Sequence, residues 1–209
     1  MEKLKLTKGG SINLSKRYSG ETKYRVGLAW DISGSGRDAD LDALILEVCP
    51  DGRIPDIDHV VGFPSGDPDR ENYRNITFST PDGGTGFKDP EDAVKHFGDA
   101  RTALASDGDD ESIEIDLAKV NPKVSELILI VSIYNPGMTF KDVGAPEISI
   151  YKGSSQVSDL SYQLSESFPE YSVIEVAKIK KDAGTWTLEA LGNGSVDLEA
   201  ELKKYHIPV

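Results

Sequence analysis

The stretch LILIVSI, from Leu127 to Ile133, is a nearly unbroken apolar run that is rich in β-branched residues. A run of this kind, with no charged helical face, is typical of a central β-strand that is covered on both sides. We therefore expect this segment to lie deep in the core of a β-sheet protein.

Strand patterns extend outward from this run in both directions. Apolar and polar residues alternate in YRVGLAWD (Tyr24–Asp31) and in SIEIDL (Ser112–Leu117), which is the period of a half-buried strand. The further expected strands are Ser11–Ser15, Leu41–Val48, His59–Phe63, Ile76–Ser79, Glu147–Lys152, Leu160–Leu164, Val173–Ile179 and Thr185–Leu191. About ten strands result in all, so an all-β fold is predicted.

Two short helices complete the expected elements. The first is Pro90–Phe97, with Asp89 as its N-cap and proline at the first helical position. The second is Val196–Tyr205, which has an apolar stripe and a favourable Glu199–Lys203 pair at i,i+4 spacing. Both are expected at the periphery of the sheets.

Length and composition favour one domain that spans residues 1–209. A chain of 209 residues with 38% hydrophobic residues can bury a single sizeable core. Pro64–Phe87 is rich in Gly, Pro, Asp and Asn and is interpreted as a surface excursion, not as a linker between domains. With the expected helix, it forms a surface insertion at about 64–97.

Charge and cysteine content restrict the partners and the compartment. The chain has 23 basic and 36 acidic residues, a net charge of -13, which repels nucleic acid and attracts divalent cations. A single cysteine, Cys49, excludes an intramolecular disulfide, and the start MEKLKLTKGG lacks the apolar segment of a secretory signal or membrane span. We expect a cytoplasmic protein with no transmembrane segment.

The first concentration of acid lies in GRDADLDALILEV, where Asp38, Asp40 and Asp42 are two residues apart. In an extended chain, these carboxylates project from the same side, which continues into Leu44, Leu46 and Val48. We expect this apolar row to face inward and the three acids to lie at the rim of the sheet, where like charges need a cation. An EF-hand is excluded, since its sixth and twelfth positions would hold Ala43 and Cys49.

The second concentration is SDGDDESIEIDL, just ahead of a predicted strand. Together the two clusters supply enough hard oxygen donors for one or two Ca²⁺ ions, with carbonyls and water completing six to eight ligands per ion. The candidate ligands outside the first cluster are Asp31, Asp99, Asp107, Asp109, Asp110 and Glu111. Either cluster alone fits a solvated acidic turn about as well as a metal site.

Softer metals are not predicted. Zinc and copper sites usually recruit His or Cys, and His59, His96, His206 and Cys49 are far apart in sequence with no ligand spacing.

Several separated motifs cover nearly the whole chain: LTKGGSINLSK, YRVGLAWD, RDADLDA, FGDART, DGDDESIEIDLAKV, IYN, GTWTLEALGNG and DLEAELKKYHIPV. Together they resemble the TerD family of tellurium-resistance and general stress proteins. The resemblance implies a calcium-binding β-sandwich, that is, two mostly antiparallel sheets with two short peripheral helices, whose acidic motifs meet around paired ions. It places Asp38, Asp40 and Asp42 on the first acidic motif, and Asp99, Asp109, Asp110 and Glu111 on the second.

The chain departs from this family pattern in one turn. Where the family usually has an Asn-Arg-Thr-Gly type of turn, this sequence has Ala100, Arg101, Thr102 and Ala103. One oxygen ligand is therefore expected to be missing, which leaves the number of ions open.

The function expected from these observations is a non-enzymatic, calcium-responsive module of a tellurite or chemical stress response. Calcium would order the two acidic loops into a surface for protein partners of a stress-response or membrane-associated complex. One alternative is calcium-dependent docking to anionic lipid, although basic and apolar loop tips are sparse. A less favoured alternative is a metal-dependent phosphoesterase. No nucleophile elbow, Ser-His-Asp order or phosphate loop is present.

Overall fold

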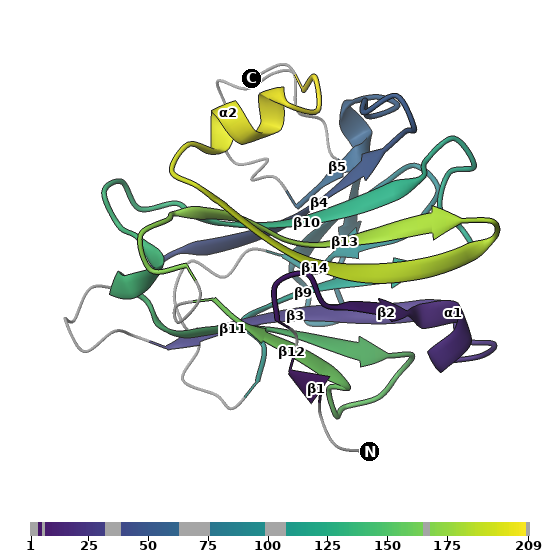
Figure 1. The fold of residues 1–209 in the computed structure, drawn as a ribbon, viewed down its shortest axis with the longest axis horizontal. Coiled ribbons are helices and arrows are strands. Elements are labelled where there is room, and N and C mark those ends of the chain that lie inside the picture. The colour runs from purple at the N-terminus through teal and green to yellow at the C-terminus, as the bar shows by residue number, and fades with distance from the viewer. Residues whose placement is uncertain are drawn as a thin grey trace.

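Two β-sheets lie face to face in the computed structural model, with the C-terminal helix on the outside of one of them (Figure 1). The structure describes residues 4–5, 7–31, 39–62, 76–98, 108–164 and 168–207. Strands dominate these residues, so the predicted all-β sandwich is confirmed.

The larger sheet has eight strands in the described part of the chain, in the order β1-β12-β11-β3-β9-β8-β7-β6. Its described strand pairings are antiparallel except for β1 with β12, which agrees with the predicted mostly antiparallel sheets. The strands are β1 (Leu4–Lys5), β3 (Lys23–Asp31), β6 (Ile76–Ser79), β7 (Thr85–Lys88), β8 (Val94–His96), β9 (Glu111–Asp116), β11 (Gly144–Lys152) and β12 (Leu160–Gln163).

The smaller sheet has six strands in the described residues, in the order β2-β14-β13-β10-β4-β5, and its pairings are all antiparallel. The strands are β2 (Ser11–Asn13), β4 (Leu41–Val48), β5 (Val60–Val61), β10 (Glu126–Ile133), β13 (Val173–Asp182) and β14 (Thr185–Ser195).

Strand β10 has an apolar layer on each side, as the run Leu127–Ile133 predicts. Leu127, Leu129 and Val131 belong to the main core between the sheets. Ile128 and Ile130 belong to a second apolar cluster on the other side of the six-stranded sheet. Burial on both faces explains why the sequence of this strand does not alternate.

The second cluster lies under helix α2 (Leu198–Lys203), where Leu198 and Leu202 pack on the sheet. It also contains Leu44, Leu46 and Val48 of β4, so the prediction that this row faces the interior between the sheets is wrong. The inward row is instead Leu41, Ala43 and Ile45. All eight residues of β4 are buried, and an apolar row of this kind does not reveal which of two covered faces it occupies.

The C-terminal helix confirms the predicted helix Val196–Tyr205, although it is shorter. Asp197 caps it by accepting a hydrogen bond from the backbone N–H of Ala200, and the expected Glu199–Lys203 ion pair is present at 2.5 Å. The other described helical segments are α1 (Leu14–Arg17) and two 3₁₀ turns, η1 (Ile57–His59) and η2 (Phe140–Asp142). None of the helices in the described ranges has the length and apolar character needed to cross a membrane.

The predicted helix Pro90–Phe97 is wrong. The side chain of Asp89 does cap backbone N–H groups, accepting from Glu91, Ala93 and Val94, but these belong to a turn. Asp92 has a φ of 61°, which right-handed helix does not allow. The chain then enters β8, which pairs with β7 and β9.

The predicted surface insertion at about 64–97 contributes strands to the eight-stranded sheet. β6 coincides with the expected strand Ile76–Ser79 and pairs with β7 at the end of the strand order. Residues 64–75 of the excursion lie outside the described residues.

Candidate functional site

The two acidic motifs meet at one end of the sandwich, where Trp30 at the end of β3 connects them. The backbone N–H of Trp30 donates to Asp110 Oδ2 at 2.9 Å. Its indole Nε1 donates to the carbonyl oxygen of Ala39 at 2.9 Å, and Trp30 is 3% exposed. The residues that precede β4 and those that precede β9 are therefore held against the same buried side chain.

Glu111 makes a second connection, this time between the sheets. It begins β9 in the eight-stranded sheet, and its Oε2 accepts the backbone N–H of Ala43 in the six-stranded sheet at 3.0 Å. His96 Nε2 lies 3.3 Å from the same oxygen, and Glu111 is 3% exposed. A buried carboxylate that accepts a backbone N–H fixes the two strands relative to each other.

The first acidic motif is partly enclosed at this junction. Asp40 is half-buried, its backbone N–H donates to Asn135 Oδ1 at 2.7 Å, and its carbonyl accepts from the N–H of Tyr134 at 2.8 Å. Asp42 lies opposite Ser132 of β10 and is 9% exposed. This degree of burial is unlike that of a solvated acidic turn.

Asp109 lies elsewhere, although it was expected to be a metal ligand. One carboxylate oxygen pairs with Arg25 and the other accepts from the hydroxyl of Tyr151 at 3.0 Å. The carboxylate lies directly over Gly27, where an added Cβ would come within 2.0 Å of Asp109 Cγ. Because both oxygens are already engaged on β3 and β11, we remove Asp109 from the candidate ligands.

The remaining predicted ligands divide by position. Asp31 is exposed at the end of β3. Asp38, Asp99 and Asp107 fall outside the described residues, so their placement at the site stays a prediction. The residues whose backbone the structure brings to one end are Asp40, Asp42, Asp110 and Glu111. Asp42 shares the face of β4 with Leu44, on the other side of the six-stranded sheet from Glu111, and no three ligand atoms of these four described residues lie within 4.8 Å of one another.

Sequence reasoning did not single out three residues that organise this end, namely Trp30, His96 and Asn135. Each of them contacts a residue more than eight positions away in the chain. In the sequence, Trp30 is recognisable only as one member of an apolar row. Asn135 belongs to the short IYN segment, and that motif is its only signal.

The donor set of this end consists of carboxylate oxygens, which suit a hard cation. Ca²⁺ takes six to eight oxygens from carboxylates, backbone carbonyls and water, whereas softer metals prefer nitrogen or sulfur. Asp40, Asp42, Asp110 and Glu111 therefore fit calcium by their chemistry, with Asp110 and Glu111 also holding the backbone in place.

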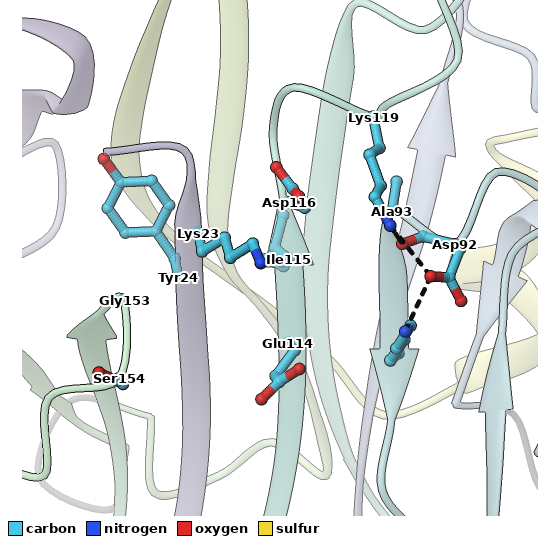
Figure 2. Close-up of a pocket in the computed structure, with 11 residues that line it drawn as sticks. Lys23, Tyr24, Asp92, Ala93, Glu114, Ile115, Asp116, Lys119, Gly153 and Ser154 are labelled. Atoms are coloured by element: carbon cyan, nitrogen blue, oxygen red, sulfur yellow. Dashed lines mark hydrogen bonds and ion pairs between the residues drawn. The ribbon is translucent and has the colours of Figure 1, made fainter. Parts of the chain in front are cut away.

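A groove of about 280 Å³ lies at the opposite end of β3 and β9 (Figure 2). Lys95 and Lys119 both bind Asp92 there, at 2.9 and 3.0 Å, and Lys23 faces the same groove. Glu114 and Asp116 also line it, so positive and negative groups are mixed. This balance gives the groove no clear preference for an anion or a cation, and we assign no ligand to it.

A family model and known proteins that resemble this chain point to the same family. The TerD domain family matches residues 2–205. The chain is 31% identical to the tellurium resistance protein TerD of Serratia marcescens, over 90% of this chain and 89% of that protein. It is 30% identical to the uncharacterized protein YceE of Bacillus subtilis, over 99% of both chains.

Solved structures show the same fold at lower identity. A homologue of the telluride resistance protein TerD from Streptomyces coelicolor superposes with a TM-score of 0.63 at 19% identity, covering 85% of this chain and 92% of that one. The likeness covers most of this chain and supports the two-sheet architecture.

Proposed function

The chain belongs to the TerD family of tellurium-resistance and stress-response proteins, and on that premise we propose that it is a calcium-binding, non-enzymatic module of a chemical stress response. The observation that carries the proposal is the convergence of the two acidic motifs, which Trp30 and Glu111 hold together across the two sheets. Calcium would bind where these motifs meet.

Four carboxylates are the proposed source of calcium ligands: Asp40 and Asp42 from the first motif, and Asp110 and Glu111 from the second. Bringing like charges to one end of the molecule costs Coulombic energy, which a divalent cation offsets. The ion supplies positive charge and a fixed ligand geometry, and the surrounding loops take a defined arrangement when it is bound.

The function that follows is presentation of a binding surface. The loops next to these acids would be ordered by calcium and would then contact protein partners of the stress-response system. The single Cys49 and the net charge of -13 support the same picture of a cytoplasmic module that does not bind nucleic acid.

A thermal unfolding experiment tests the calcium proposal. Ligand that binds only the folded state at 100 times its Kd stabilises it by about 2.7 kcal/mol, so Ca²⁺ should raise the melting temperature of the chelator-treated protein. The double variant Asp40→Asn, Asp42→Asn keeps the side-chain shapes and should lose most of this shift.

The matched control is the double variant Asp51→Asn, Asp182→Asn, which removes the same charge from exposed positions. It should respond to Ca²⁺ as the unmodified chain does. Equal shifts in both double variants would place calcium elsewhere on the acidic surface and contradict the proposal. Calcium-dependent sedimentation with anionic vesicles, lost in the first double variant only, would instead favour a lipid partner.

A further inference from the structure

A second group of side chains with metal-ligand chemistry lies at the other end of β4, away from the acidic motifs. Glu47 is near the end of β4, His59 is the last residue of η1, and Glu91 lies in the turn between β7 and β8. One ligand atom from each lies within 4.8 Å of the other two, which is the only such gathering among the described residues. Asp42 and Glu47 are five positions apart along β4, or roughly 16 Å.

Glu47 is the central observation. Its side chain points between the sheets and is fully buried, at 0% exposure. Neither carboxylate oxygen has a hydrogen-bond partner among the described residues. A buried carboxylate without a donor is costly, so this position calls for either a proton on Glu47 or a bound cation.

His59 presents its free ring nitrogen to the same space. Its Nδ1 lies 2.8 Å from Asp56 Oδ1, so Nδ1 can donate a proton to that carboxylate while the lone pair of Nε2 binds a metal ion. That Nε2 is buried without a hydrogen bond and lies 3.2 Å from Glu91 Oε2. A carboxylate that orients a histidine in this way is the usual outer partner of a metal-binding imidazole.

Glu91 is held in a similar manner. Its Oε1 accepts from Asn121 Nδ2 at 2.5 Å, which leaves the buried Oε2 directed at His59. The buried carboxylate of Asp89 fixes the turn by accepting backbone N–H groups, including that of Glu91 at 3.2 Å. The Glu91 side chain is 28% exposed, so solvent reaches this side of the group.

The charged groups that act on Glu47 are carboxylates. Burial, followed by the carboxylates of Asp89, Glu91 and Asp56, raises the pKa of Glu47 to about 9. The three ligand atoms therefore lie in a place where a cation would be stabilised by charge as well as by geometry.

We propose that Glu47, His59 and Glu91 bind one divalent transition-metal ion of the first row, with Zn²⁺ as its representative. Metal–ligand bonds of about 2.0–2.2 Å place tetrahedral ligand atoms roughly 3.3–3.6 Å apart, which is within the observed spacing. One imidazole nitrogen with two carboxylates suits zinc or a similar metal better than calcium, which prefers oxygen alone. The site is independent of the proposed calcium site.

Such an ion would join the two sheets. Glu47 and His59 come from β4 and the turn before β5 in the six-stranded sheet, whereas Glu91 precedes β8 in the eight-stranded sheet. Binding would therefore cross-link the sandwich at this end, and the expected role is structural.

The test measures Zn²⁺ binding to the chelator-treated full chain by calorimetry and by thermal unfolding. The Asp40→Asn, Asp42→Asn variant is the background, so that the acidic motifs contribute little. Glu47→Gln keeps the side-chain shape and cannot ionise to bind a metal, so it should fold and lose zinc binding. His59→Asn keeps an N–H donor for Asp56 but removes Nε2, and it should also lose zinc binding.

The control is His206→Asn, an exposed histidine with a φ of 59° that asparagine adopts readily. It should bind zinc normally, with a melting-temperature increase equal to that of the background. Asp56→Asn should weaken zinc binding about 10–100-fold, because the histidine loses its orienting carboxylate. Co²⁺ in place of Zn²⁺ should give the visible absorption of a low-coordinate nitrogen–oxygen site.

Two outcomes would overturn the proposal. One is the absence of saturable zinc binding in the background protein, which would mean that Glu47 is instead kept neutral by a proton. The other is equal zinc binding in Glu47→Gln, His59→Asn and the His206→Asn control, which would mean adsorption to surface groups. Neither outcome bears on calcium, whose response in Glu47→Gln should match that of the unmodified chain.

Discussion

At the scale of single residues, the buried carboxylates determine how this molecule is organised. Glu111 and Asp110 accept backbone N–H groups and so fix neighbouring strands. Asp109 pairs with Arg25 and Tyr151 over the bare backbone of Gly27. Acidic residues that look equivalent in sequence therefore have separate roles, which are set by the donors around them.

Asp92 gives a residue-scale prediction. Lys95, Lys88 and Lys119 lie 2.9–3.0 Å from its carboxylate and hold its pKa well below its usual range. Asp92→Asn should lower the free energy of unfolding by about 1 kcal/mol at neutral pH, a value reduced for partial exposure. Asparagine tolerates the positive φ at this position, so backbone strain should not contribute.

The pH dependence of this effect follows from the lowered pKa. The stabilisation is complete above the unfolded-state pKa of about 3.9 and is lost as the pH falls toward the folded-state pKa. Urea unfolding in chelator should be measured at pH 7 and at successively lower pH. The difference in the free energy of unfolding between Asp92→Asn and the unmodified chain should become smaller as the pH falls. A difference in the free energy of unfolding that does not change with pH would contradict this prediction. So would an equal difference for the exposed control Asp182→Asn.

At the scale of elements, local patterns predicted the strands well because period and β-branching are local properties. Leu127–Ile133, Ile76–Ser79 and the C-terminal helix were found where the sequence indicated. Pro90–Phe97 was not, because a capping aspartate and a following proline serve a tight turn as well as a helix. The pairing of β8 with β9 decides between them, and that pairing is not local.

The orientation of β4 could not be predicted for a related reason. Both of its faces are apolar, and which face meets α2 depends on where the last residues of the chain return. The candidate calcium site was foreseen as two acidic clusters. Its connections through Trp30 and Asn135, and the separate position of Asp109, depend on contacts that only the folded sheets create.

Helix α2 gives the element-scale prediction. Leu202 is 1% exposed and belongs to the cluster with Leu44, Leu46 and Ile128. Leu202→Ala should therefore lower the free energy of unfolding by about 2–5 kcal/mol, through lost burial and a residual cavity. Urea unfolding measures this loss.

The control for this prediction is Val196→Ala just before the helix, where valine is 70% exposed. Its effect should stay within about 0.5 kcal/mol. If the two variants lost similar amounts of unfolding free energy, the packing of α2 on this apolar cluster would not stabilise the protein.

At the scale of the whole molecule, β4 joins two sites of different chemistry. Its first residues lie with the all-oxygen acidic motifs, and its last residues carry Glu47 toward His59 and Glu91. At each end, residues from both sheets take part, so an ion at either place would bear on how the sheets are held together. Of these two ends, the acidic one is proposed to bind calcium.

Calorimetric titration of the chelator-treated chain with Ca²⁺ tests this calcium site. We expect saturable binding heat that the Asp40→Asn, Asp42→Asn variant loses and that Glu47→Gln and the Asp51→Asn, Asp182→Asn control retain. Binding heat that is absent from the unmodified chain, or that survives unchanged in Asp40→Asn, Asp42→Asn, would contradict it.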